Sequence, residues 1–414
     1  MKSPGPYLRG SVLPTVVVVS VLMLTGMLGL YALWESETLL FARSCRLRQA
    51  RADVESAYAL YSLHPDREEL AHPGGYRLYD SLSLSRVLVE VRPWGLYDAV
   101  TVATSDSLLC VCRLLGARPE AGNTLCYADG RSAVTLAGRT ELRGVLSLPQ
   151  NGLAYGRVGA DFFRGREIPR MAVRRSAGTI PAPTGEAEAR IGALFANAPQ
   201  TLDDALPDSL LCPFLRDSMV FRLGDAEIGG CLLRGRIVLY GDELRIDSAC
   251  RIGHLLICAR KITVGSGARI TAQLFARDTI VVEARAVLEY PSGIYAGQYA
   301  GIGDRAEVNG YAIVRDTVRR KKVTASYRQS RTARLRGLLW VDGVAQVQGV
   351  VSGCAVLRQA AYFSPQGYYK DMLYDVALLE NPVTARPLWL ASERRKEAAC
   401  VQGPDCLPSA CAAG

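Results

Sequence analysis

Residues 243–289 read ELRIDSACRIGHLLICARKITVGSGARITAQLFARDTIVVEARAVLE and contain one pattern three times, at a spacing of 18 residues. The copies begin at Glu243, Lys261 and Thr279. The apolar residues that occupy the same position in each copy are Leu244, Ile262 and Ile280; Ile246, Val264 and Val282; and Ile252, Ile270 and Leu288. Period-2 apolar pairs at a fixed short interval let each coil of a β-solenoid stack its inward side chains on those of the previous coil. The stretch therefore predicts a parallel β-helix.

The flanking sequence extends this β-helix over residues 217–360. A second inward strand per coil recurs at about the same interval, at residues 237–239, 255–257 and 274–275. The connectors between strands, such as Gly241-Asp242, are short and fit corners better than hairpins. A basic insertion at residues 315–336 interrupts the pattern, and an irregular C-terminal tail is predicted for residues 361–414.

Residues 65–210 are predicted to form a β-rich domain. Apolar and polar residues alternate on either side of residues 92–95 (RPWG), which is typical of a hairpin. Residues 138–148 repeat the alternation and the glycine corners of the coils, which favours an earlier set of coils. A short helix capped by Thr184 is predicted for residues 184–196.

The N-terminus combines a basic head with a transmembrane helix. Residues 1–10 carry Lys2 and Arg9. Residues 11–34 carry no charge, and a helix of this length can cross about 30 Å of hydrocarbon. A cleaved secretory signal is rejected because the apolar run is too long and Trp34-Glu35 is no small-residue cleavage site.

Residues 35–64 contain no Gly or Pro and predict a juxtamembrane amphipathic helix that packs against a partner or its own domain. Its stripe recurs at intervals of seven, at Leu40, Leu47, Val54 and Tyr61. The predicted fold class is thus mainly β, with this N-terminal helix followed by a β-rich region and a parallel β-helix.

This N-terminus resembles that of type IV prepilins and minor pseudopilins. The resemblance lies in the short basic leader that closes on Gly10, the uncharged span that begins at Ser11 and the helix that continues amphipathically. It implies that a prepilin peptidase cleaves after Gly10 and that Ser11 becomes the new N-terminus. Thr15 stands where most of the family has a glutamate. An ordinary uncleaved signal anchor is the alternative.

Charge and cysteine content bear on location. The formal net charge is +9, but residues 315–336 hold nine Arg or Lys against one Asp, so the basic character is local and argues against a nucleic-acid partner. Lys2 and Arg9 favour a cytoplasmic head, whereas four arginines in residues 43–51 favour the reverse. The short head and the 12 cysteines lead us to predict a single-pass inner-membrane protein with its bulk in the periplasm; buried thiols are the alternative reading of the cysteines.

The sequence contains no common catalytic motif and only three histidines. A carbohydrate-active β-helix would use acids on neighbouring coils, and the regular coils offer Asp242, Asp247, Asp278 and Glu283. No two of these acids share a register position on adjacent coils, whereas Glu243 and Lys261 do, which predicts a charge ladder on the outer face. We therefore expect no catalytic residue, metal or cofactor.

The basic insertion has two interpretations, a polyanion-binding site or a solvated loop. In the first, it holds an acidic polysaccharide or lipid head groups. The candidate residues are Arg319, Arg320, Lys321, Lys322, Arg328 and Arg331.

The coils around Ile246, Val264 and Val282 resemble those of bactofilins, in their length and their glycine and alanine corners. The resemblance implies a membrane-associated bacterial scaffold whose short β-helices stack end to end. We predict a membrane-anchored, non-enzymatic structural or interaction protein of the bacterial envelope, anchored through residues 11–34, that associates with itself or with other envelope proteins. The alternatives are a minor pilin-like component of a type IV pilus or type II secretion machine, and a carbohydrate-active β-helix.

Overall fold

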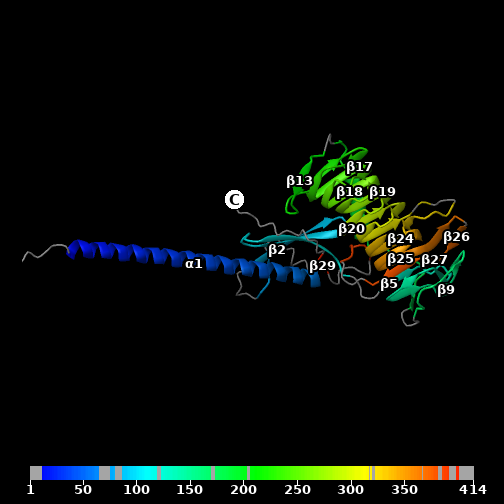
Figure 1. The fold of residues 1–414 in the computed structure, drawn as a ribbon, viewed down its shortest axis with the longest axis horizontal. Coiled ribbons are helices and arrows are strands. Elements are labelled where there is room, and N and C mark those ends of the chain that lie inside the picture. The colour runs from blue at the N-terminus through cyan, green and yellow to red at the C-terminus, as the bar shows by residue number, and fades with distance from the viewer. Residues whose placement is uncertain are drawn as a thin grey trace, which may run out of the picture.

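One long helix carries a small antiparallel sheet and a large solenoid (Figure 1). The computed structural model describes residues 12–64, 75–79, 86–118, 123–168, 173–202, 206–316, 318, 322–365, 367–380 and 385–390, and the backbone of residues 398–400. Strands make up 51% of the chain, and the β-solenoid has about 12 turns. The predicted fold class, mainly β with an N-terminal helix and a parallel β-helix, is confirmed.

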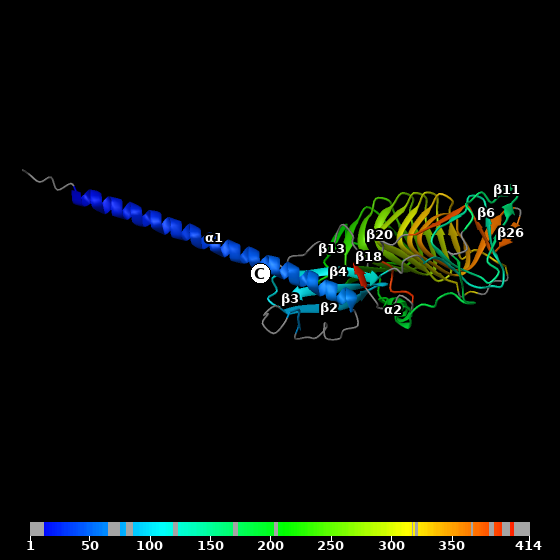
Figure 2. The same cartoon turned by 90° about the horizontal axis from the view of Figure 1, so that it is seen from below.

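Helix α1 (Val12–Leu63) is unbroken over 52 residues, about 78 Å at 1.5 Å per residue. Residues 12–43 are all exposed, and this half projects from the molecule as a bare rod (Figures 1 and 2). The helix is long and apolar enough to cross a membrane. Its last turns are buried at Ala50, Asp53, Val54, Ala57, Tyr58 and Tyr61. The end of the predicted amphipathic helix, with Val54 and Tyr61 of its stripe, therefore packs against the chain's own sheet, whereas Leu40 of the same stripe is exposed.

That sheet is antiparallel, in the order β1-β2-β3-β4-β29. Its bounds are β1 Tyr76–Arg77, β2 Arg86–Trp94, β3 Tyr97–Thr104, β4 Cys110–Ala117 and β29 Ala398–Cys400. The β2–β3 hairpin lies where the RPWG motif predicted one. One face buries valines against α1, at Val87, Val89, Val100, Val102 and Val111.

The repeat forms three stacked parallel strands, β17 (Ile237–Ile246), β18 (Arg251–Val264) and β19 (Arg269–Val282). The predicted ladders are confirmed: Leu244 pairs with Ile262 and Ile262 with Ile280, and the other two ladders hold the same register. Their side chains are buried in one core that runs along the solenoid. The strands keep one register from coil to coil because successive side chains of a strand point to opposite faces. A slip by one residue would turn every inward side chain to solvent.

Further coils extend the stack in both directions. The earlier strands are β13 Ser209–Cys212, β14 Met219–Arg222, β15 Ala226–Ile228 and β16 Leu232–Gly235. The later strands are β20 Val287–Ala296, β21 Tyr299–Ile302, β22 Glu307–Arg315, β23 Tyr327–Gln329, β24 Arg334–Gln346 and β25 Gly349–Ser364. Strand β23 lies inside the predicted basic insertion and takes its place in a coil, between β21 and β24.

The far end of the solenoid is built from two distant parts of the chain. Strand β25 pairs in parallel with β28 through residues 349–352 and with β5 through residues 355–357. The early strands are β5 Asn123–Tyr127, β6 Val134–Ala137, β7 Glu141–Leu142, β8 Val145–Leu148, β9 Leu153–Tyr155 and β12 Val173–Arg175, and the late ones are β27 Met372–Tyr374 and β28 Val376–Leu379. Residues 138–148 thus belong to coils, as predicted, and residues 372–379 are strands where the sequence predicted an irregular tail.

Hairpins and a helix decorate this frame. Strand β10 (Arg157–Val158) pairs with β11 (Asp161–Phe162), and the end of β25 pairs with β26 (Gly367–Lys370). Helix α2 (Gly185–Ala196) starts at the N-cap Thr184, whose hydroxyl accepts a hydrogen bond from the Ala187 amide.

One face of the solenoid is buried on its outer side as well. Outward residues on this face, including Leu256, Phe275 and Trp340, pack in a second core with the β2–β3 turn, α2 and residues 385–390. Trp340 lies 5.2 Å from Trp389, centroid to centroid, with the rings edge to face. This two-sided burial explains why residues 237–239 and 255–257 are continuously apolar instead of alternating.

Candidate functional site

The structure describes three of the six predicted polyanion-binding residues. Lys322, Arg328 and Arg331 are exposed. Outside the described residues lie Arg319, Arg320 and Lys321, together with the predicted processing junction Gly10 and Ser11. Arg328 and Arg331 line a groove of about 690 Å³ on the solenoid, which we call the hairpin groove because the β25–β26 hairpin contributes to it. Polyanion binding by these arginines stays a prediction.

The floor of the hairpin groove is one register column across four coils. Val281 pairs with Gly301, Gly301 with Arg328, and Arg328 with Gln346. Gly301 adds no side chain to this column. A Cβ at Gly301 would lie 2.9 Å from the hydroxyl oxygen of Tyr299, which occupies the space instead. The hydroxyl of Tyr299 therefore lies over the floor between Val281 and Arg328.

Aromatic side chains line the groove where β25 leaves the solenoid. Tyr362 and Phe363 lie on the part of β25 that pairs with β26, and Tyr374 lies on β27. The ring centroid of Tyr362 lies 4.6 Å from that of Tyr374. All three are partly exposed. The groove thus presents aromatic surface that is apolar on its faces and carries hydroxyl groups at its edge.

The side-chain amide of Gln346 is the notable polar group of the groove. Gln346 is 7% exposed. Its Nε2 donates to Oε1 of Gln348 at 3.5 Å, whereas its own Oε1 has no hydrogen-bond partner. A buried acceptor without a donor costs free energy unless a ligand or solvent completes it. Gln346 therefore places a buried acceptor without a hydrogen-bond partner in the lining of the groove.

The carboxylates of the groove are already engaged. Asp304 accepts hydrogen bonds from Ser330 and, at 3.2 Å, from the Thr332 hydroxyl. Asp375 accepts from the backbone N–H of Arg139 at 2.8 Å, and its Oδ2 forms an ion pair with Nε of Arg331 at 3.2 Å but no hydrogen bond. Within the part of the chain that the structure describes, the guanidinium of Arg328 makes no ion pair. Arg328 is thus the cation that remains open to an anionic ligand.

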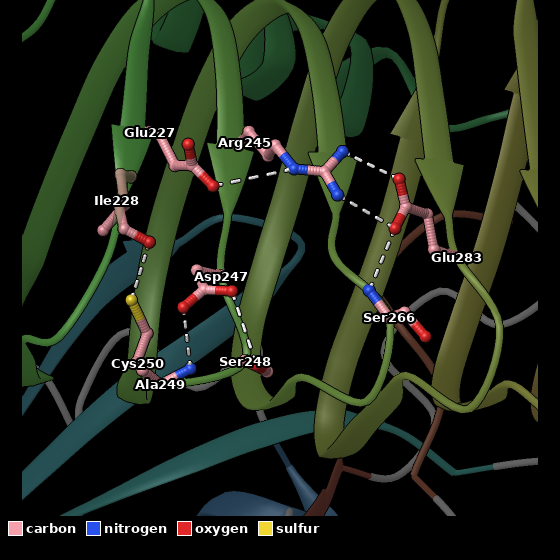
Figure 3. Close-up of polar contacts among 9 residues, drawn as sticks. All are labelled: Glu227, Ile228, Arg245, Asp247, Ser248, Ala249, Cys250, Ser266 and Glu283. Carbon is pink, nitrogen blue, oxygen red and sulfur yellow. Dashed lines mark hydrogen bonds and ion pairs between the residues drawn. The ribbon is translucent and has the colours of Figure 1, made fainter.

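A charge ladder that ends at Glu283, in the lining of the groove, links the coils (Figure 3). The guanidinium of Arg245 donates to both carboxylate oxygens of Glu283, at 2.7 and 3.1 Å, and lies 3.8 Å from Glu227. Glu283 also accepts from the backbone N–H of Ser266 at 3.0 Å. The hydrogen bond from Arg245 lowers the pKa of Glu283 below its usual value. Glu283 is therefore an ionised link between coils.

Of the other candidate acids, Asp247 and Asp278 also have structural partners, whereas Asp242 is exposed. Asp247 accepts from the backbone N–H of Ala249 at 3.2 Å, and such backbone donors lower its pKa (Figure 3). Asp278 accepts from Nε2 of Gln298 at 2.9 Å. The predicted outer ladder is confirmed, since Nζ of Lys261 lies 3.2 Å from Oε2 of Glu243. Among the described residues, no three His, Cys, Asp or Glu side chains are grouped to hold a metal ion.

Sequence and structure comparisons add nothing to this geometry. No protein-family model, curated protein or solved structure matches the chain at a significant level. The resemblances to prepilins and bactofilins therefore stay predictions, and the site rests on its own residues.

Sequence reasoning located the two arginines of the groove but missed its aromatic and amide groups. Tyr362 and Phe363 belong to the aromatic-rich stretch AYFSPQGYY at residues 361–369, which is a signal for an exposed hairpin. For Gln346 no local signal exists, because its position opposite Arg328 depends on how two coils stack.

Proposed function

We propose that this chain is a single-pass protein of the bacterial inner membrane whose β units stand in the periplasm and serve as a structural or interaction element without turnover. The continuity of α1 is the observation that supports this most. Residues 12–43, which include its apolar first half, are exposed, while its last turns are built into the antiparallel sheet. A flexible linker would let the β units tumble, whereas a continuous helix holds them at a set height and orientation above the membrane.

The joint between helix and sheet is fixed by polar contacts as well as by packing. The hydroxyl of Tyr58 lies 2.9 Å from the carbonyl oxygen of Val100 and 2.8 Å from that of Val111, so it can donate to either of two adjacent strands. Arg113 donates to Glu55 at 2.8 Å and stacks over the Tyr58 ring at 4.5 Å. The hydrogen bond from Arg113 lowers the pKa of Glu55. These contacts favour a rigid stalk.

A labelling experiment tests which side holds the bulk. We expect Lys322→Cys, at an exposed position, to add one site for a membrane-impermeant maleimide in intact spheroplasts, relative to the parent chain. The matched variant Lys2→Cys, in the basic head, should react only after lysis. Labelling of the head but not of position 322 in intact spheroplasts would reverse the topology and overturn the periplasmic assignment.

Association through the open end of the solenoid is part of this proposal. Strand β13 pairs with β16 on one side, and its neighbourhood exposes Leu211 (64%), Met219 and Val220. Unpaired strand edges with apolar side chains invite pairing with another chain. End-to-end contact is also what the resemblance to bactofilins implies. Leu211→Glu should therefore lower the apparent mass in analytical ultracentrifugation, whereas Leu202→Glu, also exposed, should not; an unchanged mass for Leu211→Glu contradicts this contact.

A minor pilin-like component is the second candidate, and the same helix favours it. Removal of a leader after Gly10 would leave a bare apolar helix that is rigidly attached to its domain, as lateral packing in a helical assembly requires. Mass spectrometry of the purified mature protein distinguishes the candidates. A mature N-terminus at Ser11, lost in Gly10→Glu, supports the pilin-like function; retained Met1 excludes it and leaves an uncleaved anchor.

A further inference from the structure

We propose that the hairpin groove binds an acidic oligosaccharide. Binding by the groove rests on its own residues, whereas the choice of a glycan over a lipid head group rests on the membrane anchor proposed above. Three features of its lining point to that class of ligand: aromatic faces, a buried acceptor without a hydrogen-bond partner, and an exposed arginine that forms no ion pair with any described residue.

The aromatic faces suit sugar rings. Tyr299, Tyr362 and Tyr374 are each partly exposed on the groove, and they come from three different strands. An aromatic ring buries a large flat apolar area at low entropic cost, and its hydroxyl still bonds to polar groups. The C–H face of a pyranose is flat and apolar while its rim is polar. Such rings therefore match a sugar in both respects.

The amide of Gln346 calls for a donor. Its Oε1 is buried and has no hydrogen-bond partner, although the Nε2 of the same side chain contacts Gln348. An unpartnered acceptor selects a ligand that brings an O–H or N–H. Sugar hydroxyls supply that donor, whereas the oxygens of sulfate only accept. Gln346 therefore favours an oligosaccharide over sulfate.

Arg328 adds the requirement for negative charge. It lies opposite Gln346 in the same register column, so cation and acceptor are neighbours on the groove floor. A guanidinium binds a carboxylate through two parallel hydrogen bonds. Arg331, by contrast, is held by Asp375 at 3.2 Å. The floor thus recognises one anionic group beside a hydroxyl, as on a uronic acid.

Size and place fit a short glycan better than a lipid head group of the anchoring membrane. A volume of about 690 Å³ lies in the range of small-ligand sites, about 300–1,000 Å³. Figure 1 shows β26, the partner strand of the β25–β26 hairpin, at the end of the molecule opposite the bare half of α1. A head group in the membrane that α1 crosses is remote from the groove, whereas an envelope glycan reaches it.

The test measures binding of the full chain in detergent micelles to a panel of hexasaccharides. The panel contains hexagalacturonate, its methyl ester as the uncharged match, a sulfated and a phosphorylated hexasaccharide, and maltohexaose. Inorganic phosphate and anionic phospholipid vesicles are tested as alternative anionic ligands. We expect saturable binding of at least one acidic hexasaccharide, weaker by about tenfold or more for its uncharged match.

Variants assign the binding to the groove. Arg328→Ala and Tyr362→Ala should each weaken binding by about tenfold, and Gln346→Leu should do the same without changing the circular dichroism spectrum. Arg336→Ala, an exposed arginine elsewhere on β24, is the matched control and should leave the affinity unchanged. No acidic hexasaccharide bound, equal loss in Arg336→Ala, or binding of phosphate or vesicles alone would each overturn the proposal.

Discussion

The side-chain amide nitrogen of Gln273 donates a 2.8 Å hydrogen bond to the carbonyl oxygen of Trp94, which lies 179 residues earlier in the chain. The Oε1 of the same side chain accepts from the backbone N–H of Leu96 and from the Tyr311 hydroxyl, both at 2.9 Å. Gln273 is 2% exposed. Its amide thus satisfies backbone groups of the β2–β3 turn that have no strand partner. It joins the antiparallel sheet to the solenoid.

Loss of that joint should be costly. Gln273→Leu keeps the volume but leaves buried groups of Trp94, Leu96 and Tyr311 without partners, so we expect a loss of about 2–5 kcal/mol in the free energy of unfolding. Urea denaturation of the full chain in detergent measures it. Gln298→Leu, which removes one partly exposed bond to Asp278, should cost less than about 1 kcal/mol. Equal losses for the two variants would contradict the role of Gln273 as the joint.

The inward ladder should dominate the stability of the solenoid. Ile262 is fully buried between Leu244 and Ile280, so Ile262→Ala should lower the free energy of unfolding by about 2–5 kcal/mol. Thr263, the next residue, is partly exposed, and Thr263→Ala should stay within about 0.5 kcal/mol. The same denaturation experiment compares them. A larger loss of stability for Thr263→Ala than for Ile262→Ala would mean that the face of the strand with Thr263, and not that with Ile262, lies in the core.

The pair of Arg245 and Glu283 predicts a pH dependence. The pKa of Glu283 is lower in the folded chain than its ordinary value of 4.5, so the pair stabilises the fold at neutral pH, and this stabilisation fades as the pH falls through the lowered pKa. The side chains are 47% and 30% exposed, so we expect Glu283→Gln to cost no more than about 1 kcal/mol at pH 7. The difference from the parent chain should shrink below pH 4.5; a difference that grows there would reverse the sign.

Two thiols of adjacent coils are placed for oxidation. The Sγ atoms of Cys231 and Cys250 lie 3.6 Å apart, and burial raises the pKa of Cys231 to about 12. The thiolate is the reactive form, so we expect the periplasmic oxidation machinery to remove two electrons and two protons from this pair while the chain folds, before burial.

Peptide mapping without reduction checks the thiol prediction. A Cys231–Cys250 peptide is expected from protein made in the envelope, and free thiols from protein made in the reducing cytoplasm, with Cys258 alkylatable in both. Free Cys231 and Cys250 in envelope-derived protein would contradict the prediction and would argue against a periplasmic solenoid.

The coils could be predicted from sequence where one chain segment supplies every neighbour. Leu244, Ile262 and Ile280 follow one another at a constant interval, so the register of the strands is written in the local pattern. The groove could not be predicted in this way. Arg328 meets Gln346 across a coil of irregular length, and Tyr374 reaches Tyr362 only because a hairpin of residues 361–370 folds back on the stack.

The pairing of β25 with β5, from an early part of the chain, has a consequence for biosynthesis. Strand β5, around Leu125, leaves the ribosome more than 200 residues before β25 is made. It can pair with β8 soon afterwards, but its other edge must stay unpaired until β25 emerges. A protein truncated after β17 but before β25 would leave two strand edges unpaired, that of β5 and that of its last coil, and would be prone to proteolysis or aggregation.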